Sequence, residues 1–290
     1  MYAIMGATGQ TGGAALQELR RRGAGVRALV RDASRAASVA AEGVETMVAD
    51  VDDPDALTRA FTGVEGAYVM LPPHLQADDA VAAGRRTSQA VAEAIDRAGL
   101  EHVVALSSGG AHLAEGTGVI RTLHDFEAEL RATRARVTFI RASDFMENWA
   151  FAVPAVLEAG ILPSGRTPFD RPMLTVSTLD IGRLAARCLL ERPSAERVLN
   201  LTGPADYSPR DLAAAFADIV GRPVELVPLP REALLPAFLE AGVGPDYARG
   251  LVEVYDGLNS GLIDFEPRFG MLVRGEVRLT QAVRAMVDRS

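Results

Sequence analysis

Three glycines spaced three residues apart, Gly6, Gly9 and Gly12, lie near the start of this chain. They follow the apolar run 2–5 and precede a helical pattern, which is the order of a strand, a loop and a helix. Glycine permits tight turns and lets an anion approach the main chain, and the N–H groups that open the helix near Gln10 would face that anion. The loop predicts a site for a dinucleotide pyrophosphate, with a glycine-rich structural turn as the alternative. The expected contacts are Gly6, Thr8, Gly9, Gln10, Thr11 and Gly12.

Charged residues follow the second and third predicted strands. In dinucleotide folds, a carboxylate after the second strand binds the adenosine ribose, whereas an arginine there binds a 2′-phosphate. Arg31 comes first and its planar guanidinium matches a phosphate, which favours NADP(H) over NAD(H), but Asp32 keeps NAD(H) open. The alternative is that both are solvated loop charges. Asp50 is placed either to accept from the adenine amino group or to cap the following helix.

Four further residues stand where predicted strands end, and ligands of open α/β sheets bind beyond such ends. We expect them to line the nicotinamide side of the site: Leu71, Pro72, Ser107 and Ser108. Each also has a structural alternative, because Pro72 can simply stop a strand and the serines can cap a turn. Their shared position at strand ends favours the binding role.

The elements that must position these residues alternate between strand and helix patterns in the first half of the chain. This alternation predicts a parallel sheet covered by helices on both faces, a doubly wound Rossmann fold. The expected strands are 2–5, 26–30, 44–49, 64–71, 102–106 and 136–141, and the expected helices are 10–23, 52–61, 77–98 and 120–132.

The rhythm changes after the sixth strand, where 148–171 is rich in proline and glycine. A strand and a helix return over 175–190, and another strand over 198–202. The remainder contains a strand at 223–229 and is otherwise mostly helical. We expect an α/β chain of two lobes: a dinucleotide-binding Rossmann domain of 1–145 plus 175–202, and a smaller α/β substrate lobe of 146–174 plus 203–290.

Composition narrows the possible partners. The net charge is −8 and no basic cluster stands out, which disfavours nucleic acid. No apolar run approaches the roughly 20 residues of a membrane span, and the residues before the first strand lead us to expect no signal peptide. The single cysteine, Cys188, excludes an internal disulfide and fits the cytoplasm. All 30 basic residues are arginine, so no lysine can act as a base or lower the pKa of a tyrosine.

Several segments of this chain resemble the NmrA-like proteins, atypical members of the extended short-chain dehydrogenase/reductase superfamily. The matching segments are 6–13 (GATGQTGG), 28–32 (ALVRD), 104–108 (VALSS), 138–141 (TFIR), 145–148 (FMEN) and 201–204 (LTGP). The resemblance implies a Rossmann domain that binds NAD(P) and a small C-terminal substrate lobe. Members of the family include quinone, azo-dye and triphenylmethane-dye reductases, and others bind the dinucleotide without turnover as redox sensors.

The chain departs from typical short-chain dehydrogenases in its catalytic residues. Those enzymes use a Tyr-x-x-x-Lys pair, but the helix expected to carry it, 122–130, has no tyrosine, and lysine is absent. His124 is the nearest remaining proton donor, with Ser107 as a second catalytic candidate; the alternative for His124 is a structural role. Asn148 and its neighbour Glu147 would face the cofactor or substrate. Trp149 and Phe151 would either wall an aromatic pocket or pack between the lobes.

These observations favour NADPH-dependent reduction of a quinone-like or other conjugated small molecule, because hydride transfer to such an acceptor depends mainly on positioning. The alternative function is a dinucleotide-binding redox sensor that acts on a protein partner. A homodimer is compatible with either, and no metal site is expected.

Overall fold

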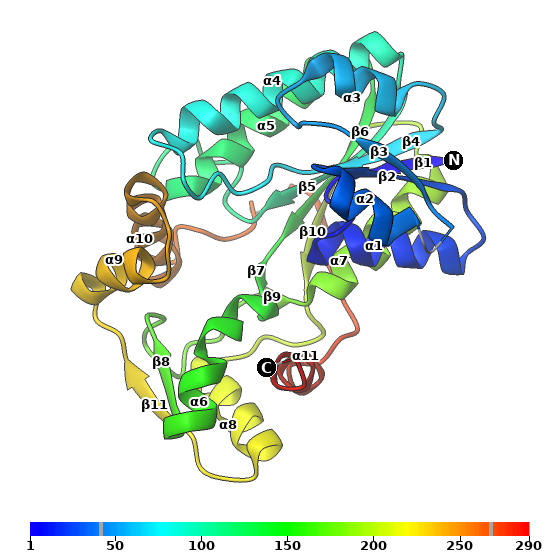
Figure 1. The fold of residues 1–290 in the computed structure, drawn as a ribbon. Helices are drawn as coiled ribbons and strands as arrows, with labels where there is room; N and C mark the ends of the chain where they lie inside the picture. The colour runs from blue at the N-terminus through cyan, green and yellow to red at the C-terminus, as the bar shows by residue number, and fades with distance from the viewer. Residues whose placement is uncertain (41–42, 267–268, 290) are drawn as a thin grey trace.

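The computed structural model describes residues 1–40, 43–266 and 269–289, and its main feature is an eight-stranded sheet in which every pairing is parallel (Figure 1). The spatial order is β12-β10-β6-β5-β4-β1-β2-β3. The reversal between β1 and β4 is typical of the doubly wound fold, as expected. The strands are β1 (Tyr2–Ile4), β2 (Val26–Val30), β3 (Glu45–Val48), β4 (Gly66–Val69), β5 (His102–Ser108), β6 (Arg136–Ala142), β10 (Arg197–Thr202) and β12 (Met271–Arg274).

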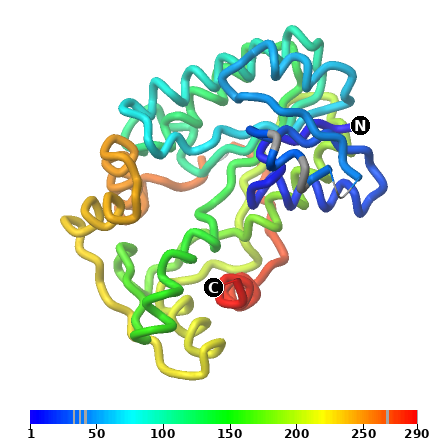
Figure 2. Tube along the Cα trace, viewed as in Figure 1, coloured from blue at the N-terminus to red at the C-terminus, as the bar shows by residue number. Residues whose placement is uncertain are grey.

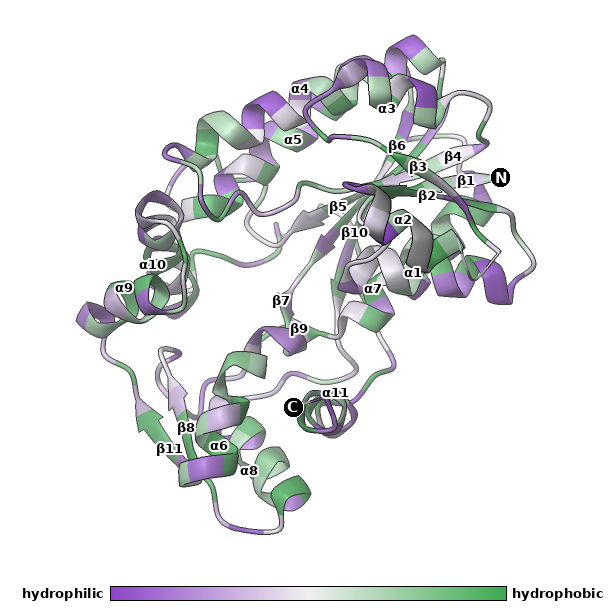
Figure 3. Cartoon of the chain, viewed as in Figure 1, coloured by the Kyte–Doolittle hydropathy of each residue, from purple (hydrophilic) through white to green (hydrophobic). Residues whose placement is uncertain are grey.

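Helices cover both faces of the sheet. Successive strand residues point to opposite faces, and the residues on each face are apolar. Tyr2 and Ile4 of β1 pack with α1 (Gln10–Arg21) and α7 (Thr178–Glu191), whereas Ala3 packs on the opposite face. That opposite face is covered by α3 (Pro54–Phe61), α4 (Ala80–Ala98) and α5 (Arg121–Arg131). Figure 3 shows the apolar strands enclosed between helices of mixed hydropathy. These elements form what we call the large lobe.

Local signals set the boundaries of α3 and α4. The Asp53 side chain accepts from the N–H groups of Asp55 and Ala56 at the start of α3, and Asp79 caps α4. Gly99 ends α4 in a left-handed conformation with φ 64°. Among the helices of the large lobe, α2 (Ala33–Ala40) was not predicted, because its eight residues are mainly alanine and serine without a clear apolar stripe in the sequence.

The remaining elements form a small lobe below the sheet, with its own apolar core. They are β7 (Asp144–Phe145), η2 (Met146–Ala152), α6 (Val153–Ala159), β8 (Ile161–Ser164), β9 (Thr175–Val176), α8 (Pro209–Val220), β11 (Glu225–Pro228), α9 (Arg231–Glu240), α10 (Pro245–Ser260) and α11 (Leu279–Val287). A short helix, η1 (Gly118–Ile120), precedes α5 and packs beside α10. Trp149, Leu162, Phe216 and Val283 are buried together in the core.

The C-terminal segment corrects one part of the expected division. Residues 271–274, assigned to the substrate lobe, pair as β12 with β10 in the main sheet. The chain returns from α10 to the sheet, where β12 pairs with β10 at the edge. It then leaves the sheet again, and α11 joins the small-lobe core near the C-terminus (Figure 2). Asp180 of α7 fixes this passage by accepting from the N–H groups of Glu276 and Val277 at 2.9 and 2.8 Å.

Within the described residues, no helix is long and apolar enough to cross a membrane, and no three His, Cys, Asp or Glu residues gather as metal ligands.

A buried histidine predicts how stability depends on pH. His102 is 2% exposed, its Nε2 lies 3.1 Å from the Cys188 carbonyl, and burial lowers the pKa of His102 below its usual 6.5. The unfolded chain therefore binds the proton more tightly, so this contribution is present above pH 6.5 and is lost as the pH falls through 6.5 toward the folded-state pKa. We expect the free energy of unfolding in urea to decrease between pH 7.5 and 5.5, and to decrease less in His102→Asn. Equal slopes in both proteins would contradict this assignment.

Candidate active site

The glycine loop joins β1 to α1 and folds back on itself too tightly for a side chain at position 12. A Cβ on Gly12 would lie 2.3 Å from the Gly6 carbonyl oxygen and 2.6 Å from that of Met5. Gly6 has φ +63°, a left-handed conformation that favours glycine, and its carbonyl accepts from the Gly9 N–H at 2.8 Å. The loop therefore depends on glycine for reasons of contact as well as of backbone freedom.

The same loop leaves main-chain donors open to an anion. Gly9 is the N-cap of α1, where no side chain caps the helix and no acidic residue occupies the first turn. The residues Gly6, Thr8, Gly9 and Gln10 are exposed. Thr11 and Gly12 are buried, and Thr11 Oγ1 accepts from Tyr68 Oη at 3.0 Å. An exposed, uncapped helix N-terminus behind a glycine turn fits a pyrophosphate group.

The end of β2 carries two arginines rather than the one noticed in the sequence. Arg31 is exposed at the strand end, and Arg35 of α2 extends back to the glycine loop, where its Nη1 lies 3.3 Å from Thr8 Oγ1. Asp32 accepts from Ser34 Oγ at 2.5 Å and from the Arg35 N–H at 2.9 Å, so its carboxylate is engaged in the first turn of α2. The hydrogen bond from Ser34 is the main reason that the pKa of Asp32 is lowered.

The side chain of Asp50 binds the backbone two residues further along the chain. It is exposed and its Oδ1 accepts from the Asp52 N–H at 3.0 Å, while Asp53 caps α3. The adenine contact expected for Asp50 stays a prediction.

A cavity of about 570 Å³ opens beyond the carboxyl ends of β4, β5 and β6, between the sheet and the small lobe, whose helix α10 contributes to its lining. Met70 links it to the glycine loop, because Met70 lines the cavity and its Sδ lies 3.3 Å from the position that a Cβ of Gly6 would take. Apolar side chains of α10 form one wall: Tyr247, Leu251, Val254 and Leu258. The structure brings five sequence-predicted residues to this cavity: Leu71, Pro72, Ser107, Ser108 and Asn148.

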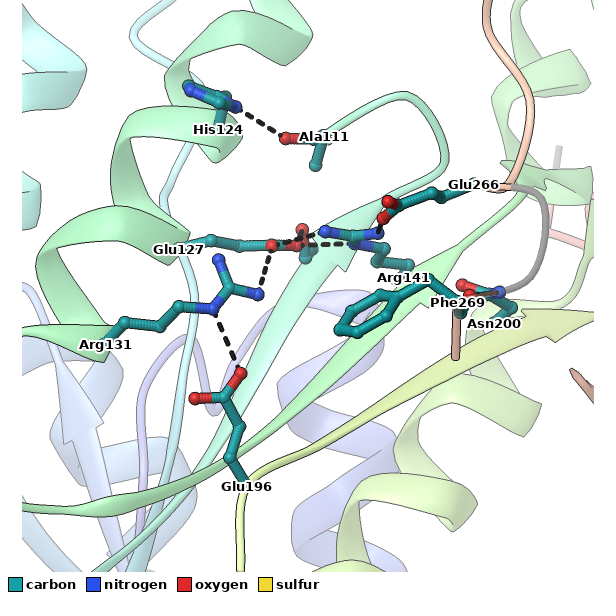
Figure 4. A network of polar contacts seen from close by, with 10 residues as sticks. Ala111, His124, Glu127, Arg131, Arg141, Glu196, Asn200, Glu266 and Phe269 are labelled. Atoms are coloured by element: carbon teal, nitrogen blue, oxygen red, sulfur yellow. Dashed lines mark hydrogen bonds and ion pairs between the residues drawn. The ribbon is translucent and has the colours of Figure 1, made fainter. Parts of the chain in front are cut away.

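Behind Ser107 lies a buried network of charged side chains, drawn in Figure 4. Glu127 of α5 is 1% exposed and accepts from Ser107 Oγ at 2.5 Å and from Arg141 Nε and Nη2 at 2.9 and 2.8 Å. Arg131 adds a fourth hydrogen bond to Glu127, and Glu266 accepts from Arg141 Nη1. Burial alone would raise the pKa of Glu127, but the hydrogen bonds from Arg141 and Ser107 outweigh it and hold the pKa below its usual value. The Ser107 hydroxyl is therefore a fixed donor within this network.

A second polar group lies on the cavity wall itself, where Arg166, just after β8, meets Asp144 of β7. Arg166 is 7% exposed, and its Nη1 lies 3.5 Å from Asp144 Oδ2. Asp144 Oδ1 accepts from Asn148 Nδ2 at 2.9 Å. Burial raises the pKa of Asp144, although the charge of Arg166 opposes the shift. We call these three residues the polar pole of the cavity, which is otherwise largely apolar.

The other sequence-predicted residues are placed away from the cavity wall. His124 Nδ1 pairs with the Ala111 carbonyl at 2.9 Å, and His124 is not a lining residue. Glu147 accepts from Ser177 Oγ and the Thr178 N–H, so it holds the start of α7. Trp149 is buried in the small-lobe core. Phe151 is 56% exposed and stacks on Trp149, with 6.0 Å between the two ring centroids. The aromatic wall expected from these two residues is not found at the cavity.

Most of the lining residues were not predicted from the sequence, and three of them are ionisable side chains with polar contacts: Asp144, Arg166 and His74. Arg166 and Asp144 lie 22 positions apart in the numbering and meet only in the folded small lobe. His74 follows Pro72-Pro73, and its Nε2 lies 3.0 Å from Thr87 Oγ1 at the cavity edge. Only His74 had a signal, because it follows the end of a predicted strand.

Comparison with known proteins relates this chain to the NmrA-like family and to NAD(P)H-dependent reductases. The model of the NmrA-like family matches residues 2–264. The chain is similar to the NAD(P)H azoreductase of Xenophilus azovorans, with 27% identity over 257 residues that make up 88% of this chain and 86% of that protein. It is 26% identical over 265 residues to quinone oxidoreductase 2 of Escherichia coli strain K12, covering 90% and 89% of the two chains. The fold is similar to that of Citrobacter sp. triphenylmethane reductase complexed with NADP(H), with a TM-score of 0.82, 23% identity and coverage of 99% of this chain and 100% of that chain.

Proposed function

Because this chain belongs to the NmrA-like family, we propose that it is an NAD(P)H-dependent reductase of a conjugated small molecule. The observation that carries the proposal is the position of the cavity of about 570 Å³, which adjoins the glycine loop at the carboxyl edge of the sheet. A volume of this size accommodates an aromatic acceptor beside a cofactor ring. The similarity to azo, quinone and triphenylmethane reductases supports the same reaction class.

Different residues of this chain would bind the dinucleotide and the acceptor. The N–H groups around Gly9 would hold the pyrophosphate, and Leu71, Pro72 and Ser108 would form the floor of the nicotinamide site. The bound dinucleotide supplies a hydride. The apolar wall of α10 excludes water and holds a flat acceptor against that floor, which is the main requirement for hydride transfer to a conjugated system.

The test is a turnover assay on the purified protein with NADPH and NADH and a panel of quinones, azo dyes and triphenylmethane dyes. We expect oxidation of the dinucleotide that depends on the acceptor. A protein that binds the dinucleotide tightly but reduces no member of the panel would instead be the redox sensor of the alternative hypothesis. Absence of both binding and turnover would contradict the two functions together.

We further propose that the chain prefers NADP(H). Arg31 and Arg35 place two guanidinium groups near the end of β2, while the Asp32 carboxylate is engaged by Ser34, by the main chain of α2 and by Arg35 Nε at 3.5 Å. An arginine–phosphate contact is worth about 1.5–3 kcal/mol. Arg31→Ala is therefore expected to weaken NADPH binding by about 10- to 100-fold in a fluorescence titration, with little change for NADH.

The matched control is Arg59→Ala, an exposed arginine in the last turn of α3. It is expected to leave the Kd of both dinucleotides unchanged. Equal weakening of NADPH and NADH in Arg31→Ala would remove the assignment of Arg31 to the 2′-phosphate.

A further inference from the structure

The polar pole contains an arginine whose hydrogen-bonding capacity is largely unused. Arg166 is 7% exposed, yet its Nη1 is a buried atom without a hydrogen-bond partner among the described residues. Its ion pair with Asp144 spans 3.5 Å, which is longer than a charged hydrogen bond of 2.7–2.9 Å. Burying an ionised donor without partners is unfavourable, and such exceptions in folded proteins call for an explanation.

The backbone around Arg166 is held firmly, so the unused side chain is not the result of a loose segment. Asn259 of α10 donates from Nδ2 to the Gly165 carbonyl at 2.8 Å and accepts the Thr167 N–H on Oδ1 at 3.1 Å. Ser164 Oγ accepts from the Arg166 N–H at 3.1 Å. Hydrogen bonds therefore fix the main chain on both sides of Arg166, and its side chain lines the cavity.

The surroundings decide what kind of group would use these donors. Asp144 already balances the charge of Arg166, so the pole has little net charge to attract a free anion. The rest of the cavity includes the apolar side chains Phe145, Met173 and Leu251. A guanidinium beside an apolar wall suits a flat molecule that ends in a neutral carbonyl oxygen.

We propose that Arg166 binds the carbonyl oxygen of a conjugated carbonyl acceptor, a quinone or an enone, and that this contact selects such acceptors over dyes without oxygen. The inference rests on the proposed function. A hydride from the reduced dinucleotide forms a C–H bond at the conjugated carbon, the π electrons move to the oxygen, and the resulting oxyanion takes a proton from water. Arg166 stabilises the negative charge on that oxygen as it develops. Asp144 and Asn259 act as positioning residues for Arg166.

The experiment compares two acceptor classes in wild type and in Arg166→Met, which keeps the length of the side chain but removes its donors. With a quinone, kcat should fall by about 100-fold, the size of effect seen when one oxyanion donor is removed. With a cationic triphenylmethane dye that lacks oxygen, kcat should be unchanged or increased. Arg166→Lys is expected to restore part of the quinone rate, and Arg210→Met, which removes an exposed partner of Asp170, should change neither rate.

A second measurement needs no turnover. 4-Nitrophenol, a planar phenol whose ionised form absorbs visible light, is titrated with pH while bound to the protein without dinucleotide. Arg166 should lower the pKa of the bound phenol in wild type relative to Arg166→Met and, if that variant does not fold, relative to Arg166→Gln, which also lacks the positive charge.

The outcomes separate the inference from the function on which it rests. Equal losses for quinone and dye, or the same phenol pKa in wild type and variant, would overturn the role of Arg166 while leaving the reductase intact. If wild type reduces no acceptor, the proposed function fails, and the phenol titration still decides whether Arg166 binds a ligand oxygen.

Discussion

Replacing Gly12 by alanine is expected to weaken dinucleotide binding by about 100-fold. The new Cβ would lie 2.3 Å from the Gly6 carbonyl oxygen and 2.6 Å from that of Met5, and both atoms belong to backbone that cannot move aside cheaply. Overpacking of this kind costs about 1–3 kcal/mol, and the loop can relieve it only by moving the N–H groups that face the pyrophosphate. A fluorescence titration with NADPH measures the loss.

Gly25→Ala is the matched control for this substitution. Its Cβ would meet no heavy atom nearer than 3.8 Å, and it also lies in a loop of the large lobe. We expect its NADPH affinity to equal that of wild type. If Gly12→Ala keeps wild-type affinity and a wild-type melting temperature, the pyrophosphate does not bind at this loop.

Replacing Glu127 by leucine is expected to cost about 3–5 kcal/mol of the free energy of unfolding. Glu127 accepts four hydrogen bonds from Ser107, Arg131 and Arg141 (Figure 4). Its loss leaves the guanidinium of Arg141, which is 2% exposed, with Glu266 as its remaining carboxylate in the network. Breaking one side of a buried ion pair is far more destabilising than replacing both sides. Urea denaturation monitored by circular dichroism measures the change.

The double variant Glu127→Leu/Arg141→Leu tests the cause. It should be less destabilised than the sum of the two single variants, because neither charge then remains buried with half of its partners. Additive effects would mean that the two side chains act independently, in conflict with the hydrogen bonds between them. The conservative variant Glu127→Gln keeps the shape and should fall between wild type and Glu127→Leu.

Much of the fold could be predicted because its signals are local. The strand 26–30 was predicted with the bounds of β2, and Asp53 and Gly99 mark helix ends through their own side chain or backbone. The short helix α2 was missed because alanine and serine carry no clear apolar periodicity. β12 was assigned to the wrong lobe because an edge strand with exposed residues looks like any lobe segment until its partner β10 is known.

Some residues of the candidate site could also be predicted from local signals, and others could not. The glycine loop, Pro72 and Ser108 could be predicted because ligands of open α/β sheets bind beyond the carboxyl ends of the strands. The structure brings Pro72 and Ser108 to one cavity. The pair of Asp144 and Arg166 could not be predicted, because 22 positions separate them in the numbering and only the folding of the lobe brings them to 3.5 Å. For Trp149 the sequence left two alternatives, a pocket wall or packing between the lobes, and the structure places it in the core of the small lobe.

The late return of the chain to the main sheet has a consequence for synthesis on the ribosome. β12 closes the edge beside β10, and α11 then supplies Leu279, Val283 and Met286 to the small-lobe core. A nascent chain that ends before residue 271 would expose the unpaired edge of β10, a template for intermolecular pairing, and would lack one side of that core. The cavity lies between the two lobes, so it would take its shape only after residues 271–287 have emerged. Folding of the central strands during translation would thus leave the acceptor site for last.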